Sequence, residues 1–354
     1  MSTDKIHNVN ILSQKLLPTP KEIRNKLPAN TDIKQTVCNF RSQIINILDR
    51  KDPRLLAVVG PCSIHNIDSA LEYAQKLKSL QAEIEDTLLV VMRVYFEKPR
   101  TSVGWKGFIN DPYLDDSFQI DEGLSMARKF LLKLAEMNLP AGTEALDPIT
   151  PQYTGDLISW TAIGARTTES QTHREIASGL STPVGFKNGT DGNITVAINA
   201  LKSAASPHHF LGINETGQCA VFHTGGNRYG HIILRGGEKP NYDATSTTHC
   251  EKELQEAGLP ENIMIDCSHA NSENTPDQQT TVLENCVNQI INGNKSIIGF
   301  MIESNLESGK QPIPKDLSLL KPGVSVTDSC VDWPTTEKML KNADDALRTV
   351  IPTR

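Results

Sequence analysis

Short apolar runs recur along the chain from Arg54 onward, and stretches with helical periodicity separate most of them. The runs are LLAVVG (55–60), TLLVVMRV (87–94), AGTEAL (141–146), WTAIGAR (160–166), PVGFK (183–187), HHFLGI (208–213), HIILRG (231–236), IMIDCS (263–268) and SIIGFM (296–301). In the stretch 68–85, apolar residues keep a spacing of three or four, which gives a helix one apolar face. Strands that alternate with helices predict a parallel sheet, and nearly continuous apolar strands predict burial on both faces.

Nine apolar runs are one more than an eight-stranded barrel requires. The stretch 213–236 holds two short strand-like runs around a Gly-Gly-Asn turn and has no room for a helix. We therefore expect a β-hairpin there, inserted after the sixth strand. Residues 1–50, broken by several prolines, are expected to form an N-terminal arm for regulation and oligomerisation. Residues 51–354 then form the predicted (β/α)8 TIM barrel, an α/β fold.

Composition and charge narrow the class of protein. The 354 residues, 38% hydrophobic and 22% charged, are typical of a globular protein of one large barrel or two domains. No window is long and apolar enough for a membrane span, and the N-terminus has no signal-peptide core. Seven cysteines without framework spacing favour reduced thiols and a cytoplasmic location. A net charge of −7 argues against a nucleic-acid partner.

Polar residues follow the apolar runs, where barrel enzymes place their active sites. Cys62, His269, Glu303 and Asp328 form one group, a mixed thiolate, imidazole and carboxylate set suited to Mn, Fe, Co or Zn. Taken singly, each also fits a plainer role as a core thiol, a hydrogen-bonded histidine or a helix cap. The convergence of all four at one barrel mouth is what favours a metal site.

The second group is basic, although the protein as a whole is acidic. It consists of Arg93, Lys98, Arg100, Lys106, Arg166, Lys187 and Arg235. Exposed lysines and arginines are usually just solvated, but these residues cap apolar strands. Guanidinium groups bind phosphate and carboxylate with two hydrogen bonds, so the group predicts one or two substrates that carry several negative charges.

Long segments of the chain resemble a known family. They are GPCSIH (60–65), RVYFEKPRTSVGWKGFINDP (93–112), IGARTTESQTHRE (163–175), PVGFKNGTDG (183–192), HIILRGG (231–237), IDCSHANS (265–272) and MIESN (301–305). They closely resemble type I 3-deoxy-D-arabino-heptulosonate 7-phosphate (DAHP) synthases, which catalyse the first step of the shikimate pathway. The resemblance implies the barrel with an arm and a hairpin. It also implies metal-dependent condensation of phosphoenolpyruvate with D-erythrose 4-phosphate and water.

The resemblance implies a role for each matching residue. Cys62, His269, Glu303 and Asp328 match the ligands of one divalent metal ion. The residues that match the phosphoenolpyruvate site are Arg93, Lys98, Glu144, Ala165, Arg166, Lys187 and Arg235. Arg100 and Thr101 match the site for the phosphate of erythrose 4-phosphate, and Lys98 is the expected proton donor to the new hydroxyl. The role of His65 stays open.

The resemblance also implies feedback inhibition by an aromatic amino acid in a homodimer or homotetramer. The matching positions are Pro151, Gln152, Leu180, Ser181, Phe210, Gly212 and Phe222. The plainer interpretation is that these are ordinary packing residues. Glycine at position 212 and the segments HNVNI (7–11), TEALDP (143–148) and GINETGQ (212–218) are more like the tyrosine-sensitive forms. We therefore expect inhibition by tyrosine, lost when residues 1–20 are deleted, with space at Gly212 for the phenolic hydroxyl or a water.

The sequence departs from the family in its loops and leaves other functions to be weighed. ENTPDQQ (273–279) is acidic where the family is basic, and ESGKQ (307–311) and Lys321-Pro322-Gly323 also differ. Lys187 could be the Schiff-base lysine of a metal-independent aldolase. A barrel kept only as an amino-acid sensor should have lost ligands or arginines, and this one has not. A sister enzyme that condenses arabinose 5-phosphate is the nearest rival.

Overall fold

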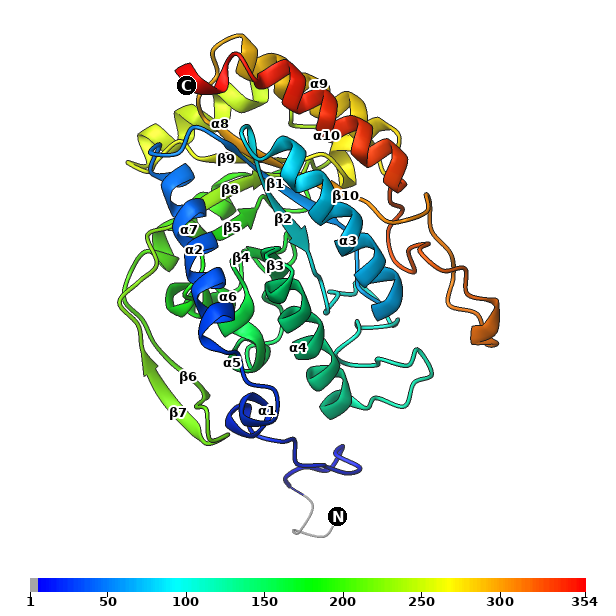
Figure 1. Cartoon of the computed structure of the whole chain (residues 1–354). Helices are drawn as coiled ribbons and strands as arrows, with labels where there is room; N and C mark the ends of the chain where they lie inside the picture. The colour runs from blue at the N-terminus through cyan, green and yellow to red at the C-terminus, as the bar shows by residue number, and fades with distance from the viewer. Residues whose placement is uncertain (1–5) are drawn as a thin grey trace.

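Eight parallel strands close into a barrel in the computed structural model, which describes residues 6–354 (Figure 1). The barrel strands in chain order are β1 (Leu55–Gly60), β2 (Leu88–Arg93), β3 (Ala141–Glu144), β4 (Trp160–Ile163), β5 (Val184–Lys187), β8 (Gly230–Leu234), β9 (Ile263–Asp266) and β10 (Ile297–Glu303). β1 pairs with β2 on one side and β10 on the other, which closes the barrel. The predicted (β/α)8 fold is confirmed.

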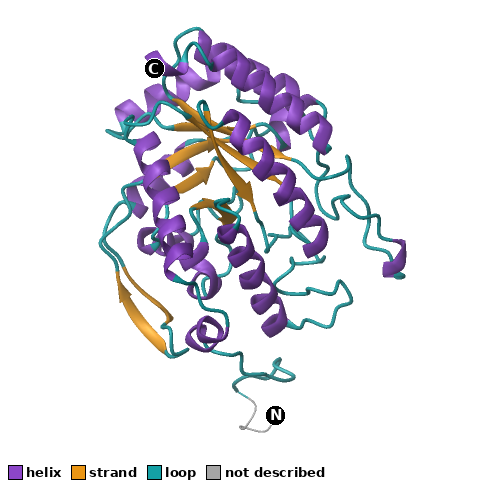
Figure 2. Cartoon of the chain, in the orientation of Figure 1, coloured by secondary structure: helices purple, strands orange, loops and turns teal. Residues whose placement is uncertain are grey.

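Helices surround this barrel and cover its outer face (Figure 2). The helices are α1 (Pro20–Lys26), α2 (Thr31–Leu48), α3 (Ile67–Ile84), α4 (Ile120–Glu136), α5 (Thr150–Thr154), α6 (Gln171–Gly179), α7 (Thr195–Ala204), α8 (Ala244–Glu256), α9 (Gln278–Ile291) and α10 (Trp333–Leu347). Short 3-10 turns lie at Gly155–Leu157, His269–Ser272, Leu317–Leu319 and Ile351–Thr353. The helix predicted at 68–85 is α3, and its apolar face is buried as predicted.

Helix α2 belongs to the barrel's core, although the sequence pattern assigns it to the arm. Its residues Phe40, Ile44 and Ile47 are buried against side chains that point into the barrel, among them Leu56 and Met301. The apolar face of this amphipathic helix therefore closes one end of the barrel. The opposite end of the barrel, at the carboxyl-terminal ends of the strands, is where the candidate site lies.

The hairpin lies earlier in the chain than predicted. Strands β6 (His209–Ile213) and β7 (Cys219–His223) pair only with each other, with a turn at Asn214–Gly217, and Figure 2 shows them beside the barrel. HIILRG, expected within the hairpin, instead supplies β8, the sixth strand of the barrel. The hairpin is thus inserted after the fifth barrel strand and α7. Both runs are short and apolar, so periodicity could not tell which one would join the barrel.

The described part of the arm leaves the body of the molecule before α1 (Figure 1). Ile6, Leu12 and Leu16 are at least 88% exposed, although their side chains are large and apolar. Among residues 6–354, no helix is both long and apolar enough to cross a membrane.

Candidate active site

A cavity of about 260 Å³ opens at the carboxyl ends of the strands. Residues from six of the eight strand ends reach it, and no two of these ends are close in sequence. The lining comprises Arg93, Lys98, Pro99, Arg100, Thr101, Ser102, Glu144, Gly164, Ala165, Arg166, Lys187, Thr190, Arg235, His269 and Asp328. Every residue predicted to bind phosphoenolpyruvate or erythrose 4-phosphate is therefore at one mouth. Lys106, the remaining member of the basic group, is exposed and does not line this cavity.

Three of the four predicted metal ligands lie together at this mouth. Ligand atoms of Cys62, Glu303 and Asp328 are all within 4.8 Å of one another. His269 joins this group only through Glu303, with its Nε2 3.8 Å from Glu303 Oε1. Gly60, two residues before Cys62, lets the end of β1 lie close to the end of β2, because a Cβ there would lie 2.8 Å from the Arg93 carbonyl oxygen.

The charge around Cys62 fits a bound cation. The pKa of the Cys62 thiol is raised to about 11, mainly by burial and next by the nearby Glu303 carboxylate. Lys98 Nζ, 3.2 Å from Cys62 Sγ, acts in the opposite direction. Because the pKa of the thiol stays raised despite Lys98 and Arg93, a thiolate beside these carboxylates needs the further positive charge of a cation. Thiolate and carboxylate donors together fit a divalent transition metal ion.

Arg93 holds the Glu303 carboxylate and the backbone at Pro61 and Cys62 in place. Its guanidinium is fully buried, donates to Glu303 Oε1 at 2.7 Å and to the carbonyl oxygens of Pro61 and Cys62, and stacks on the Tyr95 ring. Burial alone would lower the pKa of Arg93, but Tyr95 and Glu303 outweigh it and the pKa is raised. Most of this arginine's donors are thus used by the protein itself.

Asp266 is a site residue that the sequence reasoning missed. This buried carboxylate accepts hydrogen bonds from Lys187 Nζ at 2.8 Å and from the backbone and hydroxyl of Ser268. His269 Nδ1 lies 2.9 Å from the same carboxylate. Burial by itself would raise the pKa of Asp266, but His269 and Lys187 hold it well below the usual range. The sequence does contain a signal for this residue, since Asp266 directly follows the apolar residues of β9. Because Asp266 is itself the last residue of that strand, it is not among the polar residues that come after the apolar runs.

The paired Lys187 bears on the Schiff-base alternative. An ammonium group bound to a buried carboxylate at 2.8 Å is not a free amine nucleophile. On the rim, Arg166 Nε donates to Thr101 Oγ1 at 3.2 Å. This contact joins the residues expected for the two substrates into one basic surface.

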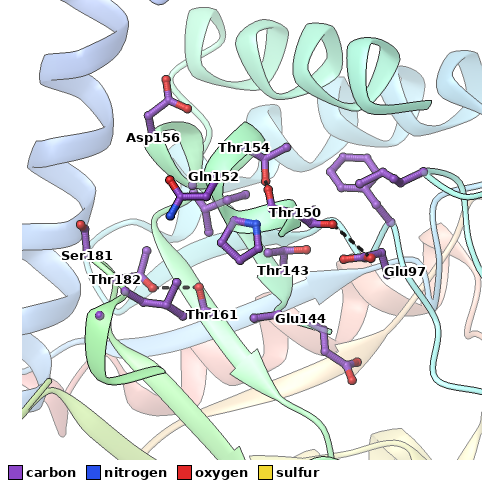
Figure 3. A pocket seen from close by; sticks show the side chains of 18 of the residues that line it. Glu97, Thr143, Glu144, Thr150, Gln152, Thr154, Asp156, Thr161, Ser181 and Thr182 are labelled. Carbon is purple, nitrogen blue, oxygen red and sulfur yellow. Dashed lines mark hydrogen bonds between the residues drawn. The ribbon is translucent and has the colours of Figure 1, made fainter. Parts of the chain in front are cut away.

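A second cavity, of about 390 Å³, shares Glu144 with the first and is lined largely by α5, β3, β4 and the loop after α6 (Figure 3). Four of the predicted inhibitor residues line it, namely Pro151, Gln152, Leu180 and Ser181. The other three, Phe210, Gly212 and Phe222, lie on the hairpin and are not among the residues that line this cavity. The space expected beside Gly212 is also in use. A Cβ there would lie 2.9 Å from the Phe222 ring, which stacks on Phe210.

Two acidic residues lie between the cavities. Glu144 lines both, and its buried Oε1 has no hydrogen-bond partner among residues 6–354. Glu97 lines the second cavity, directly precedes Lys98 of the first, and accepts a hydrogen bond from Thr150 Oγ1 at 3.2 Å (Figure 3). Burial raises the pKa of Glu97 to about 8, and Asp147 adds to the effect.

The barrel, its basic mouth and the group of Cys62, Glu303 and Asp328 (the thiolate–carboxylate group) define a (β/α)8 enzyme that acts on small anionic substrates. The model of the DAHP synthetase I family matches residues 28–341, and the chain belongs to that family. It is 54% identical to the Tyr-sensitive phospho-2-dehydro-3-deoxyheptonate aldolase of Escherichia coli K12, with 96% of each chain covered. The Phe-sensitive form of the same organism is 51% identical, with 95% of each covered. The structure of a phospho-2-dehydro-3-deoxyheptonate aldolase from Francisella tularensis superposes with a TM-score of 0.93 at 48% identity, covering 96% of this chain and 99% of that one.

Proposed function

We propose that this enzyme condenses phosphoenolpyruvate with D-erythrose 4-phosphate and water, and releases DAHP and inorganic phosphate. The observation that carries the proposal is the single cavity that joins nine predicted substrate residues to the thiolate–carboxylate group. A substrate with a phosphate and a carboxylate requires several cationic donors at once, and Lys98, Arg166 and Arg235 face the same space. The names of the relatives agree with this reaction.

The chain's own residues have separable roles in the proposed reaction. Arg166, Lys187 and Arg235 hold the phosphate and carboxylate of phosphoenolpyruvate, and Arg100 with Thr101 holds the phosphate of the aldehyde. Held in this way, the enol carbon of one substrate faces the carbonyl carbon of the other, which lowers the entropic part of the barrier. Lys98, buried between the two sets, gives its proton to the new hydroxyl oxygen.

Cys62, His269, Glu303 and Asp328 would hold one Mn, Fe, Co or Zn ion, which acts as a Lewis acid toward the aldehyde. Burial by itself would raise the pKa of the Glu303 carboxyl, but His269 and Arg93 lower it. For the Asp328 carboxyl, Lys98 and His269 likewise overcome the effect of burial on the pKa. Both carboxylates are therefore charged at neutral pH, as metal ligands must be.

The test is a phosphate-release assay with phosphoenolpyruvate and either erythrose 4-phosphate or arabinose 5-phosphate. We expect turnover with the four-carbon aldehyde and loss of turnover when a chelator is added. Preference for the five-carbon aldehyde would assign the sister reaction instead. Turnover that ignores the chelator, together with trapping of Lys187 by borohydride, would support the Schiff-base mechanism.

We also propose that tyrosine inhibits the enzyme from the second cavity. Its walls combine the apolar side chains of Phe96, Ile109 and Leu180 with hydroxyl groups such as Thr150 and Thr182, which suits a phenol ring. The proposal includes a homodimer or homotetramer in the cytoplasm, in which the arm of one subunit reaches another. Initial rates should fall at lower concentrations of tyrosine than of phenylalanine or tryptophan. Stronger inhibition by phenylalanine would overturn the assignment to tyrosine while leaving the reaction intact.

A further inference from the structure

Asp266 lies beneath the candidate active site and touches both halves of it. One oxygen, Oδ2, accepts a hydrogen bond from Lys187 Nζ at 2.8 Å and lies 2.9 Å from His269 Nδ1. Asp266 does not line the cavity. It is therefore not placed to touch a substrate, and any role in the reaction must pass through its two partners.

The other carboxylate oxygen fixes Asp266 itself. Oδ1 accepts from the Ser268 amide at 3.0 Å and from the Ser268 hydroxyl at 2.7 Å. The side chain is fully buried, and the Asn271 side chain donates to the Asp266 carbonyl oxygen at 2.8 Å. With both oxygens engaged and no solvent around it, this carboxylate has a fixed position from which to orient its partners.

The contact with His269 determines which ring nitrogen is free. His269 has an unusual backbone for a non-glycine residue, with a φ of 56°, which brings Nδ1 back toward Asp266 and Nε2 toward Glu303. Nδ1 faces two acceptors, Asp266 Oδ2 and the Ser268 hydroxyl oxygen at 2.7 Å, and that hydroxyl in turn donates to Asp266 Oδ1. An Nδ1 proton held by this pair leaves the Nε2 lone pair for a metal ion and makes it a better donor. The contact with Lys187 holds, on the same oxygen, an ammonium group that lines the cavity.

We infer that Asp266 is a positioning residue that holds the metal-binding histidine and the phosphoenolpyruvate-binding lysine through one shared oxygen. The inference rests on the proposed function, which assigns those two roles. Its consequence is specific: a single change at Asp266 weakens metal binding and phosphoenolpyruvate binding together. A change at either partner alone affects mainly one of them.

The test compares Asp266→Asn with His269→Gln and Lys187→Met. Affinity for Mn²⁺ is measured by titration calorimetry on the metal-free proteins, and KM for phosphoenolpyruvate at saturating Mn²⁺. We expect Asp266→Asn to raise the Mn²⁺ dissociation constant by about 10–100-fold, as for other residues that orient metal-bound histidines, and also to raise that KM. The electronic spectrum of the Co²⁺-substituted protein should change as well, which a purely structural role would not produce.

Asp344→Asn is the matched control. Asp344 is also a buried carboxylate, but it lies on α10, where it accepts from Thr87 and Arg348 and faces no part of the site. Its variant should shift neither constant. If Asp266→Asn moves only one constant, or moves neither, the inference is wrong.

Ser268→Ala keeps the inference testable should Asp266→Asn fail to fold. The Ser268 hydroxyl binds Asp266 Oδ1, lies 2.7 Å from His269 Nδ1 and does not line the cavity, so its loss reaches Lys187 through Asp266. We expect a smaller rise of the same KM, and an unchanged KM would overturn the inference. If His269→Gln leaves Mn²⁺ binding intact, it is the ligand assignment of the proposed function that fails.

Discussion

Side chains at the mouth of the barrel differ in whether they face the cavity or hold other groups in place. Arg166, Arg235 and Arg100 face the cavity. We expect Arg166→Ala and Arg235→Ala to raise KM for phosphoenolpyruvate, because each loses a charge-assisted hydrogen bond worth about 1.5–3 kcal/mol. Arg100→Ala should instead raise KM for erythrose 4-phosphate. Steady-state kinetics with each substrate varied in turn measures both, and equal effects on one substrate would refute the division of the cavity.

Glu97 is the residue whose ionisation should affect stability most visibly. An unfolded chain ionises it near its ordinary pKa of 4.5, but the folded protein does so only near 8, so the contribution of Glu97 to stability is fully present below pH 4.5 and is lost as the pH rises toward 8. The decline amounts to about 1.4 kcal/mol for each pH unit. The groups around this carboxyl are Asp147, Glu144 and Thr150, none of which supplies a positive charge.

Glu97→Gln should therefore remove this part of the pH dependence. Glutamine can still accept from Thr150 but cannot ionise, so the variant should be more stable than the native protein at pH 8 and similar to it near pH 4.5. Urea unfolding at several pH values gives the free energies. Glu136→Gln, at an exposed position on α4, should leave the pH dependence as it is. A parallel pH profile for Glu97→Gln and the native protein would contradict the prediction.

At the scale of elements, α1 connects parts that the family resemblance assigns to regulation. The Lys21 amide donates to the Glu215 carbonyl oxygen in the hairpin turn at 2.8 Å, and Tyr153 of α5 donates to the Pro18 carbonyl oxygen at 2.8 Å. Thr19 caps the helix through a reciprocal pair of hydrogen bonds with Glu22. A deletion of residues 1–20 would remove the contacts of Pro18 and Thr19 together with the arm, so the informative cut lies before Pro18.

We expect a protein without residues 1–16 to keep its catalytic rate and its unfolding temperature, because residues 6–16 are exposed and the barrel does not depend on them. It should lose inhibition by tyrosine, because in the proposed oligomer the arm completes a neighbouring subunit's inhibitor site. Rates at increasing tyrosine concentration test this. Full inhibition of the shortened enzyme would show that the arm takes no part in it.

At the scale of the whole molecule, the proposed metal ion joins distant parts of the chain. Cys62 follows β1, His269 follows β9, Glu303 ends β10 and Asp328 lies on the segment before α10. Because an unfolded chain cannot bring these ligands together, the ion should stabilise the folded state, by about 2.7 kcal/mol when its concentration is 100 times the dissociation constant. A chelator should lower the unfolding temperature, and Mn²⁺ should restore it.

Cys62→Ala is the control for that experiment. Its unfolding temperature should not respond to Mn²⁺ or to the chelator, and its activity should be lost. A Cys62→Ala protein with full activity would remove the thiol from the proposed ligand set. Indirect effects of the ion on solubility would appear equally in both proteins.

The sequence alone predicted those features that depend on neighbouring residues. Runs such as Leu55–Gly60 followed by helices predicted a parallel barrel, since burial on both faces requires continuous apolar strands. Polar residues after the runs predicted the mouth of the cavity, because parallel strands all end on one side. The resemblance to the family then predicted which of these residues bind the metal ion and the substrates.

Only the tertiary structure decided what depends on contacts between distant segments. Periodicity could not tell that residues 230–234 join the barrel while 209–213 pair with 219–223, because both choices satisfy the same short apolar pattern. Nor could it show that α2 fills one end of the barrel, or that one oxygen of Asp266 serves both Lys187 and His269. The reason is physical: local sequence sets which face of an element is apolar, but packing in three dimensions selects the partner that covers it.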